Sequence, residues 1–174
     1  MAPFKCVGVS KSLRRYALRK REARALLREL ADMGLELGTS HRGRVEVVEA
    51  GKFKLFLVDG RPILAERDGH RFPLLMAQEL LEGLPCVVVD MGAVPHICNG
   101  ADVMAPGVVE VRGSFGPSSL VVVRDERHGK AIAIGTALVS SEEIKQMEKG
   151  KVVANMHYVG DRIWRLARSL WHET

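Results

Sequence analysis

Cysteine and the side-chain amides are scarce in this chain of 174 residues. Cys6, Cys86 and Cys98 are odd in number and form no Cys-x-x-Cys pair. The sequence therefore predicts neither a disulfide framework nor a cysteine-based zinc site. Asparagine and glutamine together occupy only positions 78, 99, 146 and 155, and such depletion is typical of thermophile proteins.

Long apolar runs are also missing. Lys5 and Cys6 interrupt the opening residues, so no signal peptide is recognised there. No stretch approaches the ~20 apolar residues of a membrane span. We expect a soluble, cytoplasmic protein without a membrane partner.

Signatures of the common enzyme classes are absent from the sequence. The six histidines are dispersed, without His-x-x-x-His or Cys–His clusters of metal spacing. Gly113–Gly116 lacks the Gly-x-Ser-x-Gly elbow of hydrolases, and no phosphate-binding or dinucleotide-binding glycine loop follows a predicted strand. We predict no catalytic residue, no cofactor and no metal, and we expect the protein not to be an enzyme.

Charge divides the chain into two halves. Residues 1–85 contain 16 Lys and Arg against 11 Asp and Glu, whereas residues 86–174 contain 10 of each, so the first half carries the whole net charge of +5. The chain is long enough for two small cores. A turn-rich stretch at residues 82–85 predicts the boundary between a domain at 1–84 and a second at 85–174.

A cluster of basic residues opens the first half, with Glu22 as its only acid. Its members are Lys11, Arg14, Arg15, Arg19, Lys20, Arg21, Arg24 and Arg28. Apolar residues between positions 13 and 30 recur at threes and fours, which predicts a helix of about five turns. Ser10 or Ser12 is the expected N-cap, and Gly34 is the expected stop.

Like charges on one helix face repel, so a run of a single sign suggests a binding role. We interpret this face as a contact for a phosphate backbone, chiefly through Arg14, Arg15, Arg19 and Arg21. The alternative is an ordinary solvated helix face.

The rest of the first half predicts a β-meander. Its strands are expected at 44–49, 52–58 and 63–66, with one face buried because Phe53, Leu55 and Leu57 alternate with lysines. Turns are expected at Asp59-Gly60 and at residues 67–70, and a helix at 74–81 is expected to close the domain.

The second half is rich in short strands, which predicts a closed pseudo-barrel and an α+β protein overall. Strands are expected at 87–89, 94–97, 108–111, 120–123, 131–139 and 152–165. Ser140 is expected to cap a helix. Residues 157–162 predict a hairpin around Gly160-Asp161, and Trp164 is expected in the core.

Residues 99–107 contain two glycines and a proline, and a short helical turn is expected to begin at Ala101. Glycine allows close approach because it has no Cβ, and Pro106 stops a helix because it lacks an amide hydrogen. The stretch predicts a tight ledge on the surface.

Four motifs, at 100–107, 129–135, 149–151 and 157–164, follow one another in an order that resembles a PUA domain. The resemblance spans Cys86 to Leu166. The preceding half resembles the N-terminal domain of the malignant T-cell amplified sequence proteins, of ligatin and of their small archaeal relatives. The shared features are the basic opening helix, a meander through 59–62 and the step at 72–74 into a helix.

The resemblance implies an N-terminal α/β-meander domain, the pre-PUA domain, followed by a PUA pseudo-β-barrel. It also implies that the ledge binds structured RNA, either rRNA or tRNA, with Arg112 as a candidate phosphate clamp. The ledge residues are Gly100, Ala101, Met104, Pro106 and Gly107. Alternatively, Ala101 and Met104 pack a one-turn helix, and Arg112 is an ordinary exposed strand residue.

By the same resemblance, the protein is a non-catalytic factor that acts with the small ribosomal subunit and tRNA in translation initiation or recycling. A protein with a translation-initiation-type domain is an implied partner. Two alternatives stay open. One is an accessory subunit that guides a separate enzyme of pseudouridylation or tRNA base exchange, and the other is a protein adaptor.

Overall fold

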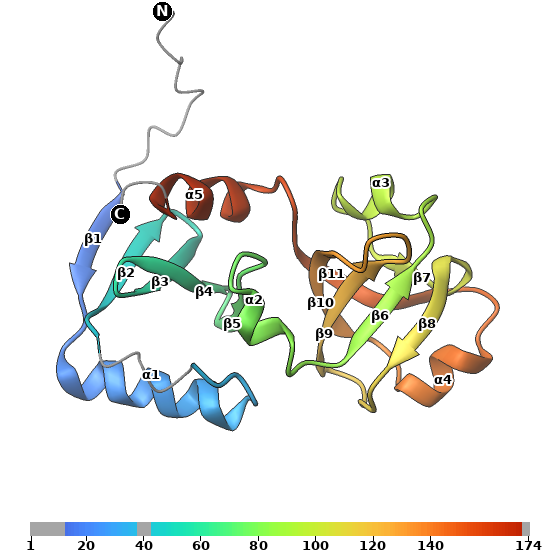
Figure 1. Ribbon diagram of the computed structural model, residues 1–174, viewed down its shortest axis with the longest axis horizontal. Helices are drawn as coiled ribbons and strands as arrows, with labels where there is room; N and C mark the ends of the chain where they lie inside the picture. The colour runs from blue at the N-terminus through green and yellow to red at the C-terminus, as the bar shows by residue number, and fades with distance from the viewer. Residues whose placement is uncertain (1–12, 38–42, 172–174) are drawn as a thin grey trace, which may run out of the picture.

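Two sheets dominate the computed structural model, which describes residues 13–37 and 43–171 (Figure 1). The first sheet is antiparallel, and its strands lie side by side in chain order. They are β1 (Arg14–Ala17), β2 (Val45–Ala50), β3 (Phe53–Val58), β4 (Arg61–Arg67) and β5 (His70–Pro73). The expected meander is confirmed.

Two of its turns follow directly from local sequence. Asp59-Gly60 joins β3 to β4, and Asp68-Gly69 joins β4 to β5. All four residues have positive φ, between 51° and 80°. Two-residue hairpin turns of this kind favour Asp-Gly because only glycine and a few short polar residues accept positive φ cheaply.

The basic segment is not one helix. Arg14–Ala17 forms β1 at the sheet edge, where Arg14 lies opposite Glu49 of β2, and helix α1 spans only Lys20–Asp32. The predicted five-turn helix is therefore wrong in its first part, because pairing with β2 offers residues 14–17 a ladder that no local pattern reveals. The side chain of Glu22 accepts the backbone N–H of Arg19 at 2.9 Å where α1 begins. Because Arg19 is the N-cap of α1, the expected cap at Ser10 or Ser12 is wrong. Ser10, Lys11 and Ser12 lie outside the described residues.

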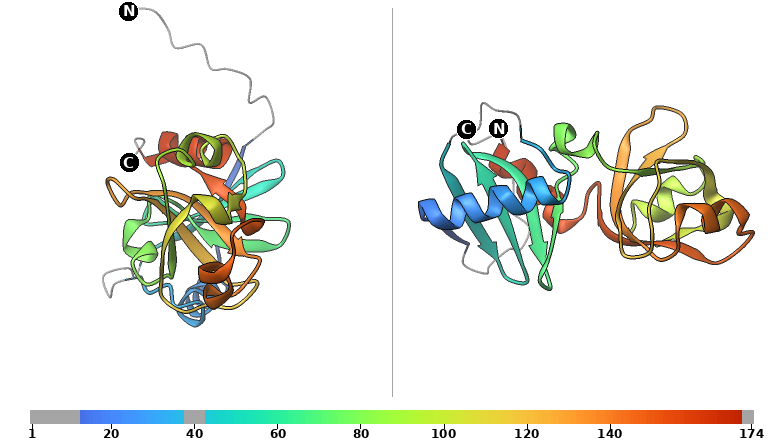
Figure 2. Two further views of the ribbon diagram at one scale, coloured as in Figure 1. Left: turned by 90° about the vertical axis from the view of Figure 1, so that its right-hand side faces the viewer. Right: turned by 90° about the horizontal axis from the view of Figure 1, so that it is seen from below.

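The end of α1 agrees with prediction, since Gly34 has φ +74° just after the C-cap Met33. The buried face of α1 covers one side of the first sheet, where Leu26 and Leu30 share a core with Phe56. Figure 2 shows α1 crossing the strands on that side.

Helix α5 (Arg162–Trp171) covers the opposite side of the first sheet, packing on β3 and β4. Leu55 and Leu57 belong to the same core as Ala167 and Leu170 of this helix. The expectation of one buried face was thus wrong, because a helix from the far end of the sequence returns to cover the second one. Trp164 is half-buried at the edge of this core.

Helix α2 (Gln78–Leu81) is shorter than the predicted helix at 74–81. The backbone N–H of Leu74 instead donates to the carbonyl of Ile63 at 2.9 Å, which prolongs the contact between β5 and β4. The predicted boundary at residues 84 and 85 falls in the connection that follows α2, although α5 packs on the first sheet. The division into 1–84 and 85–174 stays a prediction.

The second sheet has the strand order β7-β11-β10-β9-β6-β8, in which β6 and β9 run parallel and the other neighbours antiparallel. It curls around its own core, as expected for a pseudo-barrel. Its elements are β6 (Cys86–Val89), α3 (Val94–Ile97), β7 (Val103–Met104), a 3-10 turn (Ala105–Gly107), β8 (Val108–Arg112), β9 (Leu120–Asp125), β10 (Ala131–Ala137), α4 (Ser141–Gln146) and β11 (Lys151–Tyr158).

Two predictions in this half are wrong. Residues 94–97 form helix α3 rather than a strand, with Pro95 in the first turn, where a missing N–H costs nothing. No helix begins at Ala101, because Val103 and Met104 pair with β11. The Ser140 cap is confirmed, since its hydroxyl accepts the N–H of Glu143 at 3.2 Å.

The predicted strand at 152–165 and the hairpin within it are also wrong. β11 ends at Tyr158, and Gly160, with φ +91°, turns the chain into α5. The Asp161 carboxylate accepts the N–H of Trp164 at 2.6 Å and so caps that helix. Its other oxygen lies 2.8 Å from Nδ1 of the fully buried His157.

His157 joins the two sheets. The Nε2 atom of His157 accepts a hydrogen bond from the backbone N–H of Leu75, with 3.4 Å between the two nitrogens. Because Nε2 is the acceptor, the proton of the ring is on Nδ1, which donates a hydrogen bond to the Asp161 carboxylate. Although burial raises the pKa of Asp161, this hydrogen bond and those from backbone N–H groups prevail and lower it below its ordinary value.

None of the helices in the described ranges has the length and apolar character needed to cross a membrane.

Candidate functional site

We call the first sheet with the helices that cover it the first module, and the second sheet with its connecting segments the second module. The predicted ledge forms one side of a groove of about 410 Å³ on the second module. Ala101, Met104, Pro106 and Gly107 line it from the loop, β7 and the 3-10 turn, while His96 lines it from α3. Gly100 lies beside the groove and does not line it. The structure thus brings together four of the five predicted ledge residues.

Asn155 of β11 holds the ledge loop in place. Its side-chain Nδ2 donates to the carbonyls of Ile97 at 3.0 Å and Ala101 at 2.9 Å, which are the two ends of the turn after α3. Its backbone N–H donates to the Asp102 carboxylate at 2.9 Å. The three bonds fix the loop against the curled sheet.

Asp102 connects the loop to a nearby lysine. Its other carboxylate oxygen accepts Lys151 Nζ at 3.0 Å. The pKa of Asp102 is lowered, first by the hydrogen bond from the Asn155 backbone and then by Lys151. Lys151 lies directly opposite Met104 in the pairing of β11 with β7, so its ammonium group flanks the groove.

Glycines allow close contacts on both sides of the ledge. Gly100 has φ +96°, and a Cβ there would lie 3.4 Å from the Tyr158 ring. A Cβ on Gly107 would lie 3.1 Å from the Cβ of Ala93. A larger residue at Gly100 would be strained because φ is positive there, whereas a larger residue at Gly107 would push against the Ala93 methyl group.

Met104 is 44% exposed and Ala101 is exposed, so the alternative of core packing is wrong for both. Ala105 supplies the buried side chain of the 3-10 turn instead. Since Met104 and Pro106 present apolar surface and Ala93, Ile97, Ala101 and Gly107 are among the other lining residues, the groove suits a ligand that is recognised by shape.

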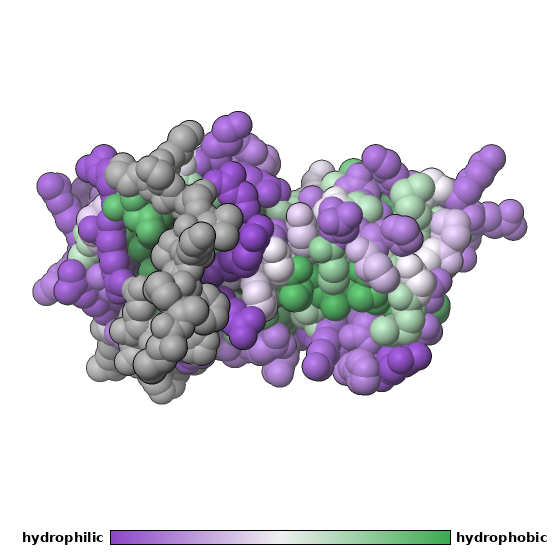
Figure 3. All heavy atoms as spheres, turned by 90° about the horizontal axis from the view of Figure 1, so that it is seen from above, coloured by the Kyte–Doolittle hydropathy of each residue, from purple (hydrophilic) through white to green (hydrophobic). Residues whose placement is uncertain are grey.

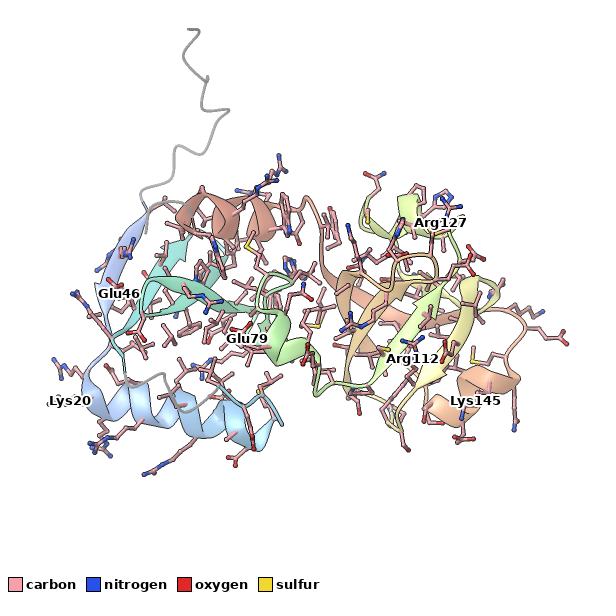
Figure 4. The ribbon with its side chains drawn as sticks, in the orientation of Figure 1. Lys20, Glu46, Glu79, Arg112, Arg127 and Lys145 are labelled. Carbon is pink, nitrogen blue, oxygen red and sulfur yellow. The ribbon has the colours of Figure 1, made fainter. Side chains whose placement is uncertain are left out.

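Arg112 lies on β8, outside the lining of this groove (Figure 4). Its Nε and one terminal nitrogen each donate to the carboxylate of Glu110 at 2.9 Å. This pairing raises the pKa of Arg112 and lowers that of Glu110. Arg112 stays a predicted phosphate contact, but the structure separates it from the ledge.

The four predicted arginines of the first module fall into two groups. Arg14 and Arg15 lie on β1, and Arg15 donates two hydrogen bonds to Glu46 at 3.2 and 3.3 Å. Arg19 and Arg21 lie at the start of α1 and form no ion pair with another described residue. The exposed side of α1 also carries Lys20, which Figure 4 shows pointing away from the sheet.

Within residues 13–37 and 43–171, no three His, Cys, Asp or Glu side chains are arranged to hold a metal ion.

Comparison with known proteins agrees with this architecture. The PUA domain model matches residues 85–159, and a domain of unknown function, DUF1947, matches residues 14–78. An uncharacterized protein of Methanocaldococcus jannaschii is 39% identical over 87% of this chain and 95% of its own. The chain belongs to this family of PUA-domain proteins. The malignant T-cell-amplified sequence proteins are among its relatives, as the sequence motifs suggested.

Two further relatives of this PUA-domain protein extend the comparison. Translation machinery-associated protein 20 of Saccharomyces cerevisiae is 28% identical over 72% of this chain and 74% of its own. The crystal structure of a PUA domain from Aeropyrum pernix K1 matches with a TM-score of 0.81 and 30% identity, over 92% of this chain and 94% of that one. The predicted fold, a meander domain followed by a PUA pseudo-barrel, is confirmed.

Reasoning from sequence missed two residues of the PUA ledge, Asn155 and Lys151. The Lys149–Lys151 motif was visible in the sequence, but only strand register places Lys151 beside Met104. Asn155 gave no signal, because its partners are carbonyls more than 50 residues away along the chain.

Proposed function

We propose that the protein is a non-catalytic RNA-binding factor that acts with the small ribosomal subunit and tRNA in translation initiation or recycling. The observation that carries this proposal is the ledge groove, in which Asn155 fixes a glycine-bearing loop beside exposed Met104. The similarity to translation machinery-associated protein 20 supports the assignment to translation.

The ledge suits recognition of an RNA helix by its shape better than recognition of particular bases. Asp90 and Asp102 line the groove together with His96, so the groove itself has no concentration of positive charge. A-form RNA is recognised largely through its shape, its 2′-hydroxyls and its phosphates. In this proposal the backbone around Gly107 approaches the sugar-phosphate chain, and Lys151 contacts a phosphate.

The first module supplies the charge that the ledge lacks. Arg21, Arg24 and Arg28 lie on the exposed side of α1 and form no ion pair with a described residue. Each phosphate that such a residue neutralises releases counterions and so strengthens binding. An RNA that contacts both modules must be large, which fits a ribosomal subunit with tRNA. The proposed protein partner carries a translation-initiation-type domain, and the proposed location is the cytoplasm.

The test is crosslinking of the full chain to RNA in an extract of its source organism, followed by sequencing of the attached RNA. Met104→Glu places a negative charge in the groove without disturbing the core. Val109→Glu is the matched control, because Val109 is an apolar residue that is 51% exposed on β8 and does not line the groove. We expect small-subunit rRNA or initiator tRNA with the wild type and Val109→Glu, and loss of both with Met104→Glu.

Two other results would overturn the proposal. Recovery of scattered RNAs that carry modified bases would favour a guide subunit of an RNA-modifying enzyme. Absence of RNA above background, together with a protein partner that stays bound after ribonuclease treatment, would favour a protein adaptor.

A further inference from the structure

A second groove, of about 410 Å³, lies where α5 meets the segment before α2 and the start of β10. Trp164, Arg168 and Trp171 line it from α5, and Leu75, Met76 and Val159 are among its other residues. The three α5 residues are spaced four and three apart, so they share one face of the helix. We call this the tryptophan groove.

Each tryptophan ring of the groove lies beneath a guanidinium group. Arg168 Cζ is 5.0 Å from the ring centroid of Trp164, and Arg61 Cζ is 4.7 Å from that of Trp171. Both rings are half-buried, so each keeps exposed surface. Flat aromatic surface beside guanidinium groups is a combination that binds unstacked nucleobases and their phosphates.

The charge around the groove favours an anionic occupant. α5 contains no Asp or Glu, and its exposed side carries Arg162, Arg165 and Arg168. None of these three forms an ion pair with a described residue. Arg61 differs, because Glu79 lies 3.6 Å from it. Figure 4 shows nitrogen-tipped side chains extending outward from α5.

We propose that the tryptophan groove binds a single-stranded RNA segment, with an unstacked base against Trp164 or Trp171 and its phosphates on the arginines of α5. The inference rests on the proposed RNA-binding function and adds to it a second site for a different form of RNA. The ledge takes structured RNA, whereas the tryptophan groove takes the unpaired segment next to it.

The chain offers a direct optical test, because its only two tryptophans both line this groove. A short oligouridylate is added to the full chain, and tryptophan fluorescence is followed to saturation. We expect quenching, because a stacked base contacts the indole ring directly. Arg168→Glu should weaken binding by at least about tenfold, since it replaces an attraction for phosphate by a repulsion.

Lys145→Glu is the matched charge reversal, since Lys145 is exposed on α4, far from α5 in Figure 4, and it should change the affinity less than about twofold. Trp164→Leu should weaken binding by about 5- to 150-fold, the range for loss of one stacked base. The exposed Arg168 provides a test even if loss of Trp164 disturbs folding.

Binding of a stem-loop RNA by the Arg168→Glu variant separates this inference from the proposed function. If the stem-loop still binds while oligouridylate does not quench wild-type fluorescence, the tryptophan groove is not an RNA site and the ledge proposal survives. Equal affinity for oligouridylate in the wild type and Arg168→Glu would also overturn the inference. Stronger quenching by an acidic peptide than by oligouridylate would assign the groove to a protein partner instead.

Discussion

The two modules expose different kinds of surface. The first carries an excess of basic residues, 16 against 11 acids in residues 1–85, and seven of the basic residues lie between Arg14 and Arg28, on β1, on α1 or just before α1. The second has equal numbers of both signs in residues 86–174 and presents a groove in which apolar residues such as Met104 and Pro106 lie beside Asp90, His96 and Asp102. Seen from above, hydrophobic atoms gather between hydrophilic side chains on the second module (Figure 3).

The folds explain this difference. The first sheet is covered on both faces, by α1 and α5, so its free surface consists largely of helix exteriors, where long charged side chains are solvated easily. The second sheet curls on itself and leaves its connecting loops exposed, and such loops can offer backbone groups to a ligand. Charge and shape are therefore supplied by separate parts of the chain.

The largest expected effect comes from breaking the junction between the modules. Asp161→Ala removes the cap of α5 and leaves buried His157 without its acceptor, which should cost about 3 kcal/mol of unfolding free energy. Urea denaturation measures the loss. Tryptophan emission should also shift to longer wavelength, because loosening of α5 exposes its tryptophans to water. Trp164 lies in the first turn of α5, and Trp171 is its last residue.

Asp125→Ala is the control for this change. Asp125 is a buried carboxylate that accepts backbone N–H groups of His128 and Lys130, entirely within the turn between β9 and β10. Its loss should reduce stability without shifting the tryptophan emission. A shift of equal size in both variants would show that α5 does not depend on Asp161.

The next effect separates charge from shape. Changing Arg21, Arg24 and Arg28 to Glu should flatten the slope of log affinity for a stem-loop RNA against log salt by about 2 to 3, since each lost phosphate contact accounts for about 0.7 to 0.9. Met104→Glu should lower the affinity and leave the slope within about 1 of the wild type. Binding titrations across a range of salt concentrations measure both quantities.

The corresponding triple change to Lys keeps the charge of α1 and is its control, so the salt slope should stay near that of the wild type. An unchanged slope in the Glu variant would remove α1 from the RNA interface and would place all of the binding on the second module.

A smaller effect is expected from loosening the ledge alone. Asn155→Ala removes two side-chain hydrogen bonds, to Ile97 and Ala101, and should cost about 1 to 2 kcal/mol of unfolding free energy. Amide hydrogen exchange should increase at residues 98–102 and stay unchanged in the first sheet. Stem-loop affinity that is unaffected by this change would argue against a fixed ledge as the RNA contact.

The smallest expected effect is a pH dependence of the ledge. The folded-state pKa of Asp102 is lowered, chiefly by the N–H of Asn155, from an ordinary value of about 4. Its contribution to stability is therefore complete above about pH 4 to 5 and is lost as the pH falls through the folded-state pKa. Asp102 is partly exposed, so solvent screening keeps the effect small.

Comparison of wild type and Asp102→Asn by thermal unfolding between about pH 3 and pH 6 tests this dependence. The stability difference between the two should shrink toward low pH. A difference that is constant across this range would show that the ionised carboxylate does not stabilise the fold.

Much of the fold could be predicted because the deciding signals are local. Asp59-Gly60 and Asp68-Gly69 fix hairpin turns through their own backbone preferences, and Ser140 caps α4 within one turn. The motif order then identified the PUA domain, and four of its predicted ledge residues do meet in one groove.

Several of the failures share one cause, which is partners that are distant in the sequence. Residues 14–17 fit a helical period, but they pair with β2 as an edge strand. Residues 94–97 are rich in residues that favour strands, yet they form α3. In the candidate site, Asn155 gave no local signal, and Arg112 is held by Glu110 outside the groove.

The sequence by itself determined the two Asp-Gly hairpin turns, the Ser140 cap, the uneven charge of the two halves and the family, because each depends on residue identity or on short spacing. Only the tertiary structure decided that α5 returns to the first sheet, that the basic segment divides into strand and helix, and that Asn155 and Lys151 support the ledge. These features depend on strand register and on burial between distant segments, and a short window of sequence contains neither.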